Sequence, residues 1–414
     1  MDLGLEAAGF ETRVAVELDA DAAATLRTNR PQWRCLEGDI HAETASSRHL
    51  LERAELRAGE ADLLVGGPPC QPFSKSGYWR DGDARRLDDP RSSTLAEYLR
   101  VLRDIQPRAF LIENVPGLAY SKKDEGIVML ERGIEEINRE TGANYSFEAA
   151  LLRAVDFGVP QDRQRLFIVG ARDGTTFEFP APTHGMNACD SGQGVCRFRT
   201  TWDAIGDLEE DADPDLAARG KWAALLPSIP EGKNYLYHTD RGGGLPLFGW
   251  RRRYWNFLLK LSKSLPSWTL TAQPGPAIGP FHWKNRRLSV QEMMRLQTFP
   301  DGYRISGSYR AATRQIGNAV PSALVEKLGL EIRRQLLGVP KPGGSQLSLI
   351  PASRPDAPPP EPVAPVPVEY LGLSGVHSSH PGTGLGRGAL ARKNGPAGVS
   401  GKPSANNLFH QKAS

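Results

Sequence analysis

Cysteine is scarce in this sequence, with only Cys35, Cys70, Cys189 and Cys196 among 414 residues. Small secreted domains held by disulfides carry a much denser set of cysteines, so that class is excluded. No stretch approaches the ~20 apolar residues of a transmembrane helix, and residues 1–10 lack the basic start and apolar run of a secretory signal. We therefore expect a cytoplasmic protein without a membrane partner, in which a role for any one cysteine is chemical.

Net charge is also small, because 51 Lys and Arg residues stand against 48 Asp and Glu residues, a balance of +3. The distribution is uneven, since residues 1–244 carry 29 basic and 41 acidic side chains and residues 245–320 carry 12 basic and 2 acidic ones. This basic stretch also contains aromatic residues, a mixture suited to neutralising phosphates and stacking on bases. A solvated basic face over a Trp-rich core is the alternative. The aromatic residues are Trp250, Tyr254, Trp255, Trp268, Phe281 and Trp283.

The first 170 residues alternate between short β-branched runs and helical patterns, which predicts a mostly parallel α/β sheet covered by helices. Ligands of such sheets bind at the carboxyl ends of the strands. Beyond residue 338 the composition changes, with ten prolines between Pro340 and Pro367 followed by a Gly-, Ser- and Asn-rich run. We expect a disordered tail there. The predicted strands are residues 14–18, 62–65, 109–112, 146–154 and 166–169, and the helices are residues 20–28, 93–104 and 126–140.

Two of the predicted strands lead directly into unusual loops. The first is Gly-Gly-Pro-Pro-Cys-Gln-Pro at residues 66–72, where prolines fix the backbone around Cys70. A rigidly held thiol at a strand end suits a nucleophile better than passive packing. The second is Glu-Asn-Val-Pro at residues 113–116. Burial at the end of an apolar strand would raise the pKa of Glu113, as a proton donor near neutral pH requires.

Two arginines precede the strand at residues 166–169. Arg163 and Arg165 alternate along the chain, so both guanidinium groups are expected to point into one cleft. There they could hold a base edge, a phosphate or the Glu113 carboxylate, although a surface salt-bridge pair is also compatible with the spacing. No metal site is expected, because His184, Cys189 and Cys196 are too few and too irregularly spaced.

These segments occur in the order found in one enzyme family. The chain from Met1 to about Gly338 resembles the C5-cytosine-specific DNA methyltransferases. The resemblance implies a Rossmann-like sheet that binds S-adenosyl-L-methionine, a smaller target-recognition domain, and double-stranded DNA as the partner. It divides the chain into a catalytic domain (1–171), a target-recognition domain (172–283), a closing helical segment (284–338) and the tail (339–414). The matching motifs are Pro-Pro-Cys-Gln (68–71), Glu-Asn-Val (113–115), Gln-x-Arg-x-Arg (161–165), Arg-Leu-Ser-Val-Gln-Glu (287–292) and Gln-Ile-Gly-Asn-Ala-Val-Pro (315–321).

The resemblance also implies roles for individual residues. The Cys70 thiolate would attack C6 of a flipped cytosine, Glu113 would assist at N3, and Arg165 would bind the base with Arg163 nearby. Glu17 and Leu18 would contact the ribose and adenine of the cofactor, and Asp39 and Ile40 the adenine. The remaining cofactor residues are Pro69, Leu95, Asn318 and Val320, and the DNA-binding residues are Arg251, Arg252, Arg253 and Thr269.

The start of the sequence differs from the family pattern. Members normally open with a strand and a Phe-x-Gly-x-Gly turn, whereas residues 1–10 resemble the helix that follows that turn. We expect the sheet to lack this strand and therefore to have unpaired edges.

The implied function is methylation of C5 in a specific duplex sequence by a monomer, as the modification enzyme of a restriction system with a cognate endonuclease. One alternative is an RNA cytosine-5 methyltransferase, because the tRNA-methylating branch of the family shares the Pro-Pro-Cys loop. A second alternative is a truncated DNA-binding pseudo-enzyme that has lost cofactor binding.

Overall fold

The computed structural model describes residues 1–43, 47–68, 93–117, 125–186, 195–208, 213–249, 255–340 and 347–373. Pro69, Cys70 and the three arginines at 251–253 lie outside these ranges, so their roles stay predictions. Among the described helices, none combines the length and the apolar character needed to cross a membrane.

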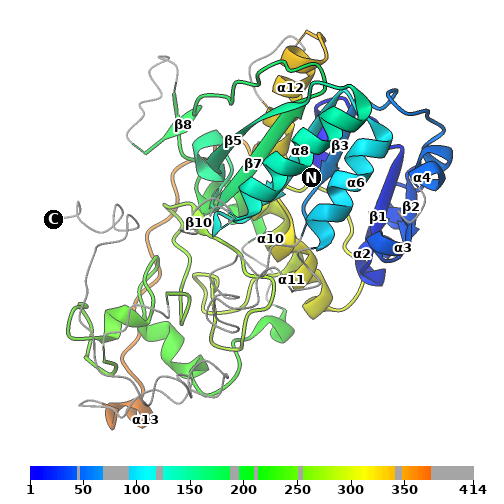
Figure 1. Ribbon diagram of the computed structural model, residues 1–414. Coiled ribbons are helices and arrows are strands. Elements are labelled where there is room, and N and C mark those ends of the chain that lie inside the picture. The colour runs from blue at the N-terminus through cyan, green and yellow to red at the C-terminus, as the bar shows by residue number, and fades with distance from the viewer. Residues whose placement is uncertain are drawn as a thin grey trace, which may run out of the picture.

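The sheet of the first 171 residues is in two pieces (Figure 1). One piece is β1-β2, a parallel pair, and the other has the order β3-β4-β7-β5. β3 and β4 are parallel as predicted, but β7 runs antiparallel to both β4 and β5. The ten residues between β5 and β7 are too few for the crossover helix that a parallel connection requires. The strands are β1 (Val14–Glu17), β2 (Arg34–Glu37), β3 (Leu63–Gly66), β4 (Ala109–Asn114), β5 (Ser146–Arg153) and β7 (Gln164–Ala171).

β1 and β3 each keep one unpaired edge within the described part of the chain. Both strands are only half-buried, whereas Ala109–Ile112 of β4 are buried. One apolar cluster under α4 and α6 contains Val16, Leu36 and Leu64, so the two pieces share a layer. β1 and β3 are thus edge strands among the described strands of the sheet.

Helices cover both faces of the larger piece. On β4, Ala109 and Leu111 face a cluster shared with α1 and α12, while Phe110 and Ile112 face α6 and α8, as the two-residue period of a strand requires. The packing of α1 on α12 is close, because a Cβ at Gly4 would lie 2.3 Å from the Ser322 carbonyl oxygen. The helices are α1 (Asp2–Ala7), α2 (Ala20–Asn29), α3 (Ile40–Glu43), α4 (Ser47–Ala54), α6 (Ser93–Ile105), α8 (Glu125–Thr141), α9 (Thr201–Ile205), α10 (Val290–Leu296), α11 (Tyr309–Asn318), α12 (Ser322–Leu336) and α13 (Val368–Leu371).

Between residues 195 and 283, the described part of the chain contains α9, short strands and four short 3-10 helices. Their core gathers buried side chains such as Leu225, Tyr235 and Phe281. β10 (Ser267–Trp268) joins this region to the catalytic domain by pairing in parallel with β6 (Gln161–Asp162). On β8 (His184–Gly185) and β9 (Cys196–Arg197), His184 lies opposite Cys196, and Cys189 lies outside the described residues.

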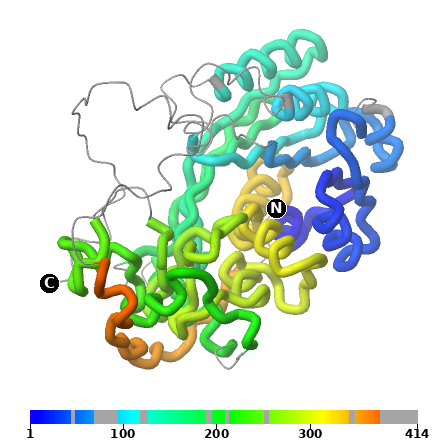
Figure 2. The backbone as a smooth tube through the Cα atoms, turned by 90° about the horizontal axis from the view of Figure 1, so that it is seen from below, coloured from blue at the N-terminus to red at the C-terminus, as the bar shows by residue number. Residues whose placement is uncertain are grey.

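The prediction of disorder for the whole tail is wrong for residues 347–373. This segment packs along the molecule from α12 to the core of residues 213–283, and it ends in α13 (Figures 1 and 2). The prediction was based on composition, but a high proline content does not by itself prevent ordered packing. Proline has no backbone N–H donor and little backbone freedom, so a proline-rich chain loses little conformational entropy when a few side chains anchor it.

Candidate active site

Glu113 and Arg165 form an ion pair at the carboxyl end of β4. Glu113 is the fifth residue of β4 and pairs with Phe167 of the antiparallel β7, so Arg165 reaches it from the neighbouring strand. Arg165 Nε lies 2.9 Å from Glu113 Oε1, and the two side chains are only 16% and 13% exposed. The pair is therefore mostly, but not fully, removed from solvent.

Burial controls the acidity of this pair. It raises the pKa of Glu113, and the nearby charges of Arg165 and Arg163 oppose that shift without cancelling it. This is the direction predicted from the sequence. Burial also lowers the pKa of Arg165, against the opposing charge of Glu113. A carboxyl group with a raised pKa beside a guanidinium can share a hydrogen bond or a proton with the polar edge of a ring.

Arg163 has a different environment from the one expected. Its guanidinium donates to the carbonyl oxygens of Leu270 (3.2 Å) and Gly317 (2.8 Å), and the residue is 1% exposed. Burial, with the charge of Arg165, lowers the pKa of Arg163 to about 9. The two arginines thus do not both enter an open cleft, and Arg163 instead joins the catalytic strand to two distant segments.

The loop that carries Cys70 leaves the sheet beside Glu113. Asn114 donates from Nδ2 to the Pro68 carbonyl oxygen at 3.1 Å, which fixes the start of that loop. A Cβ at Gly67 would lie 3.4 Å from Glu113 Oε2, so the backbone passes close to the carboxylate. Sequence reasoning assigned no contact to Asn114, although its place in the Glu-Asn-Val segment could have suggested one. Cys70 follows Pro68 by two residues.

The predicted cofactor residues of the first domain lie at the ends of β1 and β2. Glu17 ends β1, and its carboxylate accepts from the Asp19 backbone at 2.9 Å. Leu18 is 70% exposed, which is unusual for a large apolar side chain at a strand end. Asp39 precedes Ile40, the first residue of α3, and accepts from the His41 backbone at 2.9 Å.

The other predicted cofactor residues divide between surface and core. Leu95 on α6 is partly buried, Asn318 at the end of α11 is exposed, and Val320 is buried in the core under α12. α11 is held against α2 because Thr25 donates to Gln315 Oε1 at 2.7 Å. The Val320 side chain is only 4% exposed and is occupied in the core.

The stretch at residues 245–320 is not a free basic face. Trp283 and Phe281 are core residues, and Lys263 and Arg286 are buried in ion pairs with glutamates. Thr269 donates to the Asp162 carbonyl oxygen at 2.8 Å, so its hydroxyl fastens this stretch to β6. Part of the positive charge of this stretch is thus balanced inside the molecule by acidic side chains.

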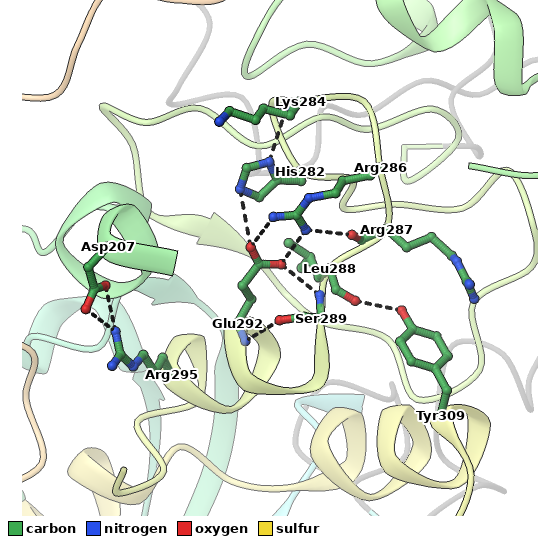
Figure 3. Close-up of polar contacts among 10 residues, drawn as sticks. All are labelled: Asp207, His282, Lys284, Arg286, Arg287, Leu288, Ser289, Glu292, Arg295 and Tyr309. Carbon is green, nitrogen blue, oxygen red and sulfur yellow. Dashed lines mark hydrogen bonds and ion pairs between the residues drawn. The ribbon is translucent and has the colours of Figure 1, made fainter. Parts of the chain in front are cut away.

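A buried polar cluster centred on Glu292 positions α10, and the sequence pattern alone indicated no function for it (Figure 3). Arg286 donates to both carboxylate oxygens of Glu292 at 2.8 and 2.6 Å, and Ser289 forms a capping box with it. His282 Nε2 lies 3.4 Å from the same carboxylate, and burial lowers the pKa of His282 to about 2, so this ring is neutral. The Ser-x-x-Glu pattern at 289–292 was the available signal for the cap.

Known proteins resemble this chain over most of its length. A family-wide sequence model described as C-5 cytosine-specific DNA methylase matches residues 1–334. Type II methyltransferase M.SacI of Streptomyces achromogenes is 41% identical over 368 residues, which cover 83% of this chain and 92% of the relative. Type II methyltransferase M.AquIA of Picosynechococcus is 40% identical over 225 residues, or 53% of this chain and 88% of the relative.

Solved structures share the fold at lower identity. A Spodoptera frugiperda DNMT2 mutant has a TM-score of 0.54 and 17% identity, covering 80% of this chain and 95% of the other. S. pombe Dnmt2 has a TM-score of 0.51 and 18% identity, covering 81% and 95%. The chain therefore belongs to the C-5 cytosine-specific DNA methylases, enzymes whose methyl donor is S-adenosyl-L-methionine.

Proposed function

We propose that this enzyme methylates C5 of a cytosine flipped out of a specific duplex DNA sequence. The observation that carries the proposal is the buried Glu113–Arg165 pair, which lies beside the start of the loop that holds Cys70. A flipped pyrimidine offers N3 and O2 on the edge that such a pair can bind. Extrusion of the base is required because C6 and C5 are not accessible to a thiol inside the stack.

Each side chain then has a chemical task. The Cys70 thiolate forms a bond to C6, and the electron pair of the C5–C6 double bond moves toward N3. Glu113 supplies a proton or hydrogen bond at N3, so the negative charge does not build up on the ring. Arg165 orients the Glu113 carboxyl group and the base edge. C5 then gains the methyl group, with S-adenosyl-L-homocysteine as the by-product. A base takes the C5 proton, the C5–C6 double bond forms again, and the Cys70–C6 bond breaks with its electron pair leaving on sulfur. The N3 proton returns to Glu113, so neutral 5-methylcytosine is released.

The residues at the ends of β1 and β2 fit the methyl donor. The exposed side chain of Leu18 offers an apolar surface for adenine, and the carboxylates of Glu17 and Asp39 can accept from ribose hydroxyls and the adenine amino group. When bound, S-adenosyl-L-methionine supplies an electrophilic methyl group. We assign the same site to Pro69, Leu95, Asn318 and the backbone at Val320.

We assign the enzyme to the Type II restriction-modification class. Two relatives at 41% and 40% identity are named Type II methyltransferases, and the first is covered over 92% of its length. The partner would be an endonuclease with the same target sequence. Residues 172–283 would read that target, with Thr269 at their joint to the catalytic domain and the arginines at 251–253 on the DNA backbone.

The test is methyl transfer from labelled cofactor to duplex DNA of random sequence, with unmodified tRNA in a parallel reaction. We expect label in duplex DNA, confined to one short sequence when methylated cytosines are mapped. Label in tRNA alone would support the RNA enzyme instead. Binding of DNA without cofactor binding or methyl transfer would identify the pseudo-enzyme.

A further inference from the structure

Residues 347–373, named here the strap, connect two apolar clusters that otherwise belong to separate parts of the chain. We propose that the strap positions the target-recognition region on the catalytic domain, with Arg354, Glu361 and Tyr370 as its positioning residues. The expected effect on DNA affinity rests on the proposed function, whereas the effect of the strap on the order of the recognition region can be tested without DNA.

The strap begins on the catalytic domain. Leu349 and Ile350 pack against the cluster shared by α1, α12 and β7. Glu326 of α12 accepts from the backbone amides of Ser348 (2.7 Å) and Leu349 (3.0 Å), and Glu326 is only 3% exposed. A buried carboxylate that receives two amides fixes both the position and the direction of the chain that follows.

The middle of the strap holds α9 and α10 together. Arg354 donates to the Asp203 carbonyl oxygen at 2.9 Å, and its guanidinium lies 2.7 Å from Asp207 Oδ1. Asp207 also pairs with Arg295 of α10 at 2.6 Å. The carbonyl of Pro355 accepts from the Trp202 indole at 3.2 Å. Arg354 thus completes a bridge in which one aspartate is shared between α10 and the strap.

The next contact is electrostatic and lies inside the recognition region. Lys263 Nζ is 3.0 Å from Glu231 and 2.9 Å from Glu361, and the Lys263 and Glu231 side chains are 3% and 4% exposed. Lys260, also 3% exposed, is close enough that Glu231 and Glu361 raise its pKa against the effect of burial, leaving it at about 8. Two lysines and one glutamate carry a net positive charge, and Glu361 is the strap residue that balances it.

The strap ends in the apolar core of the recognition region. The Tyr370 ring stacks on Trp222 at 5.8 Å between centroids, and its hydroxyl donates to the Lys221 carbonyl oxygen at 2.7 Å. Tyr370 is 5% exposed. Nearby, Ala364 N donates to the Pro227 carbonyl oxygen at 3.1 Å. The anchor is therefore comparable to a core side chain rather than to a surface contact.

Composition suits this segment to transmit position. Eight of the residues from Pro351 to Pro367 are prolines, which hold the chain extended and stiff between the anchors. A flexible linker of equal length would permit the two ends to move independently. Because the strap is stiff and anchored at both ends, it holds the recognition region in one orientation. A larger fraction of molecules is then in the arrangement that binds DNA, so the apparent DNA affinity is higher.

The experiment compares the full chain carrying Glu361→Gln and Tyr370→Ala with the wild type. Its matched control is Glu369→Gln, which removes a charge from an exposed residue next to Tyr370. We expect the double variant to raise the KM and Kd for duplex DNA about tenfold, as a drop of the competent population to about one in ten would do. The kcat at saturating DNA and the Kd for cofactor should remain within about twofold of wild type.

Hydrogen exchange provides the readout that does not depend on DNA. Amides of residues 213–249 should exchange faster in the double variant, while those of β4 and β7 keep their protection. An unchanged DNA Kd and unchanged exchange would overturn the proposal. If the double variant does not fold, Arg354→Ala alone is measured in the same way, with Arg354→Lys expected to restore part of the DNA affinity. If the double variant exchanges faster but the wild type binds no DNA, the positioning role of the strap would stand and the proposed function would be refuted.

Discussion

Replacing Glu113 with glutamine keeps the shape of the side chain and removes its acidic proton. In the structure this carboxylate is 2.9 Å from Arg165 and 13% exposed, so no bulk water substitutes for it at the bound base. Loss of a positioned general acid lowers a rate by about 10²–10⁴-fold. We expect that decrease in kcat, with little change in the Kd for duplex DNA because the recognition contacts lie in other segments.

The same substitution leaves Arg165 without its partner. Removing one member of a fully buried ion pair costs about 3–5 kcal/mol, and the residual exposure of Arg165 reduces this to roughly 1–3 kcal/mol of unfolding free energy. Urea denaturation measures this term separately from activity. Glu148→Gln on β5 is the matched control, because Glu148 is exposed and should affect neither quantity.

The pH dependence of kcat provides a further check on Glu113. Its pKa is raised, and only its protonated form can donate at N3, so the wild-type rate should fall as pH rises through that pKa. The glutamine variant should lack this alkaline limb. A variant kcat within about threefold of wild type, or a limb that persists in the variant, would refute the role of Glu113 as proton donor.

Three other predictions concern the framework around the site. Arg163→Ala removes the donor to the Leu270 and Gly317 carbonyl oxygens and should lower the free energy of unfolding by about 2–5 kcal/mol. Urea denaturation measures this loss, and a loss below about 1 kcal/mol would contradict the structural role of Arg163. Glu292→Gln leaves the buried Arg286 without its ion-pair partner and should cost about 3–5 kcal/mol, whereas Asp301→Asn, at an exposed ion pair, should cost less than about 1 kcal/mol. The β1 and β3 amides should exchange with deuterium faster than those of β4, and equal protection would show that their edges are covered.

Local patterns predicted most of the catalytic domain. The predicted strand at residues 62–65 is displaced by one residue from β3, and the predicted helix at 93–104 ends one residue before α6 does, because β-branched runs and helical periodicity act over short distances. The sequence offered the Glu113 carboxylate as one of three possible partners of Arg163 and Arg165, and in the structure Arg165 makes that contact. The direction of β7 was missed, since pairing direction depends on the length of the connection rather than on side chains.

Long-range contacts limited the remaining predictions. The Arg163 guanidinium donates to carbonyl oxygens that are 107 and 154 residues away in the sequence, and local sequence patterns do not predict contacts over such separations. The charge of the 245–320 stretch was read as a surface, although Lys263 and Arg286 find acidic partners inside the fold. Residues 347–373 were read by average composition, which hides the few anchors, such as Tyr370, that hold a proline-rich chain in place.

The central claim is that Cys70 attacks cytosine while the Glu113–Arg165 pair holds the base. The most direct measurement is transfer of labelled methyl from S-adenosyl-L-methionine to duplex DNA, followed by digestion to nucleosides and mass spectrometry. The wild type is expected to form 5-methyl-2′-deoxycytidine, and Cys70→Ser is expected to form none while still binding cofactor and DNA. Full activity in Cys70→Ser, or label at another position of the nucleoside, would contradict the account.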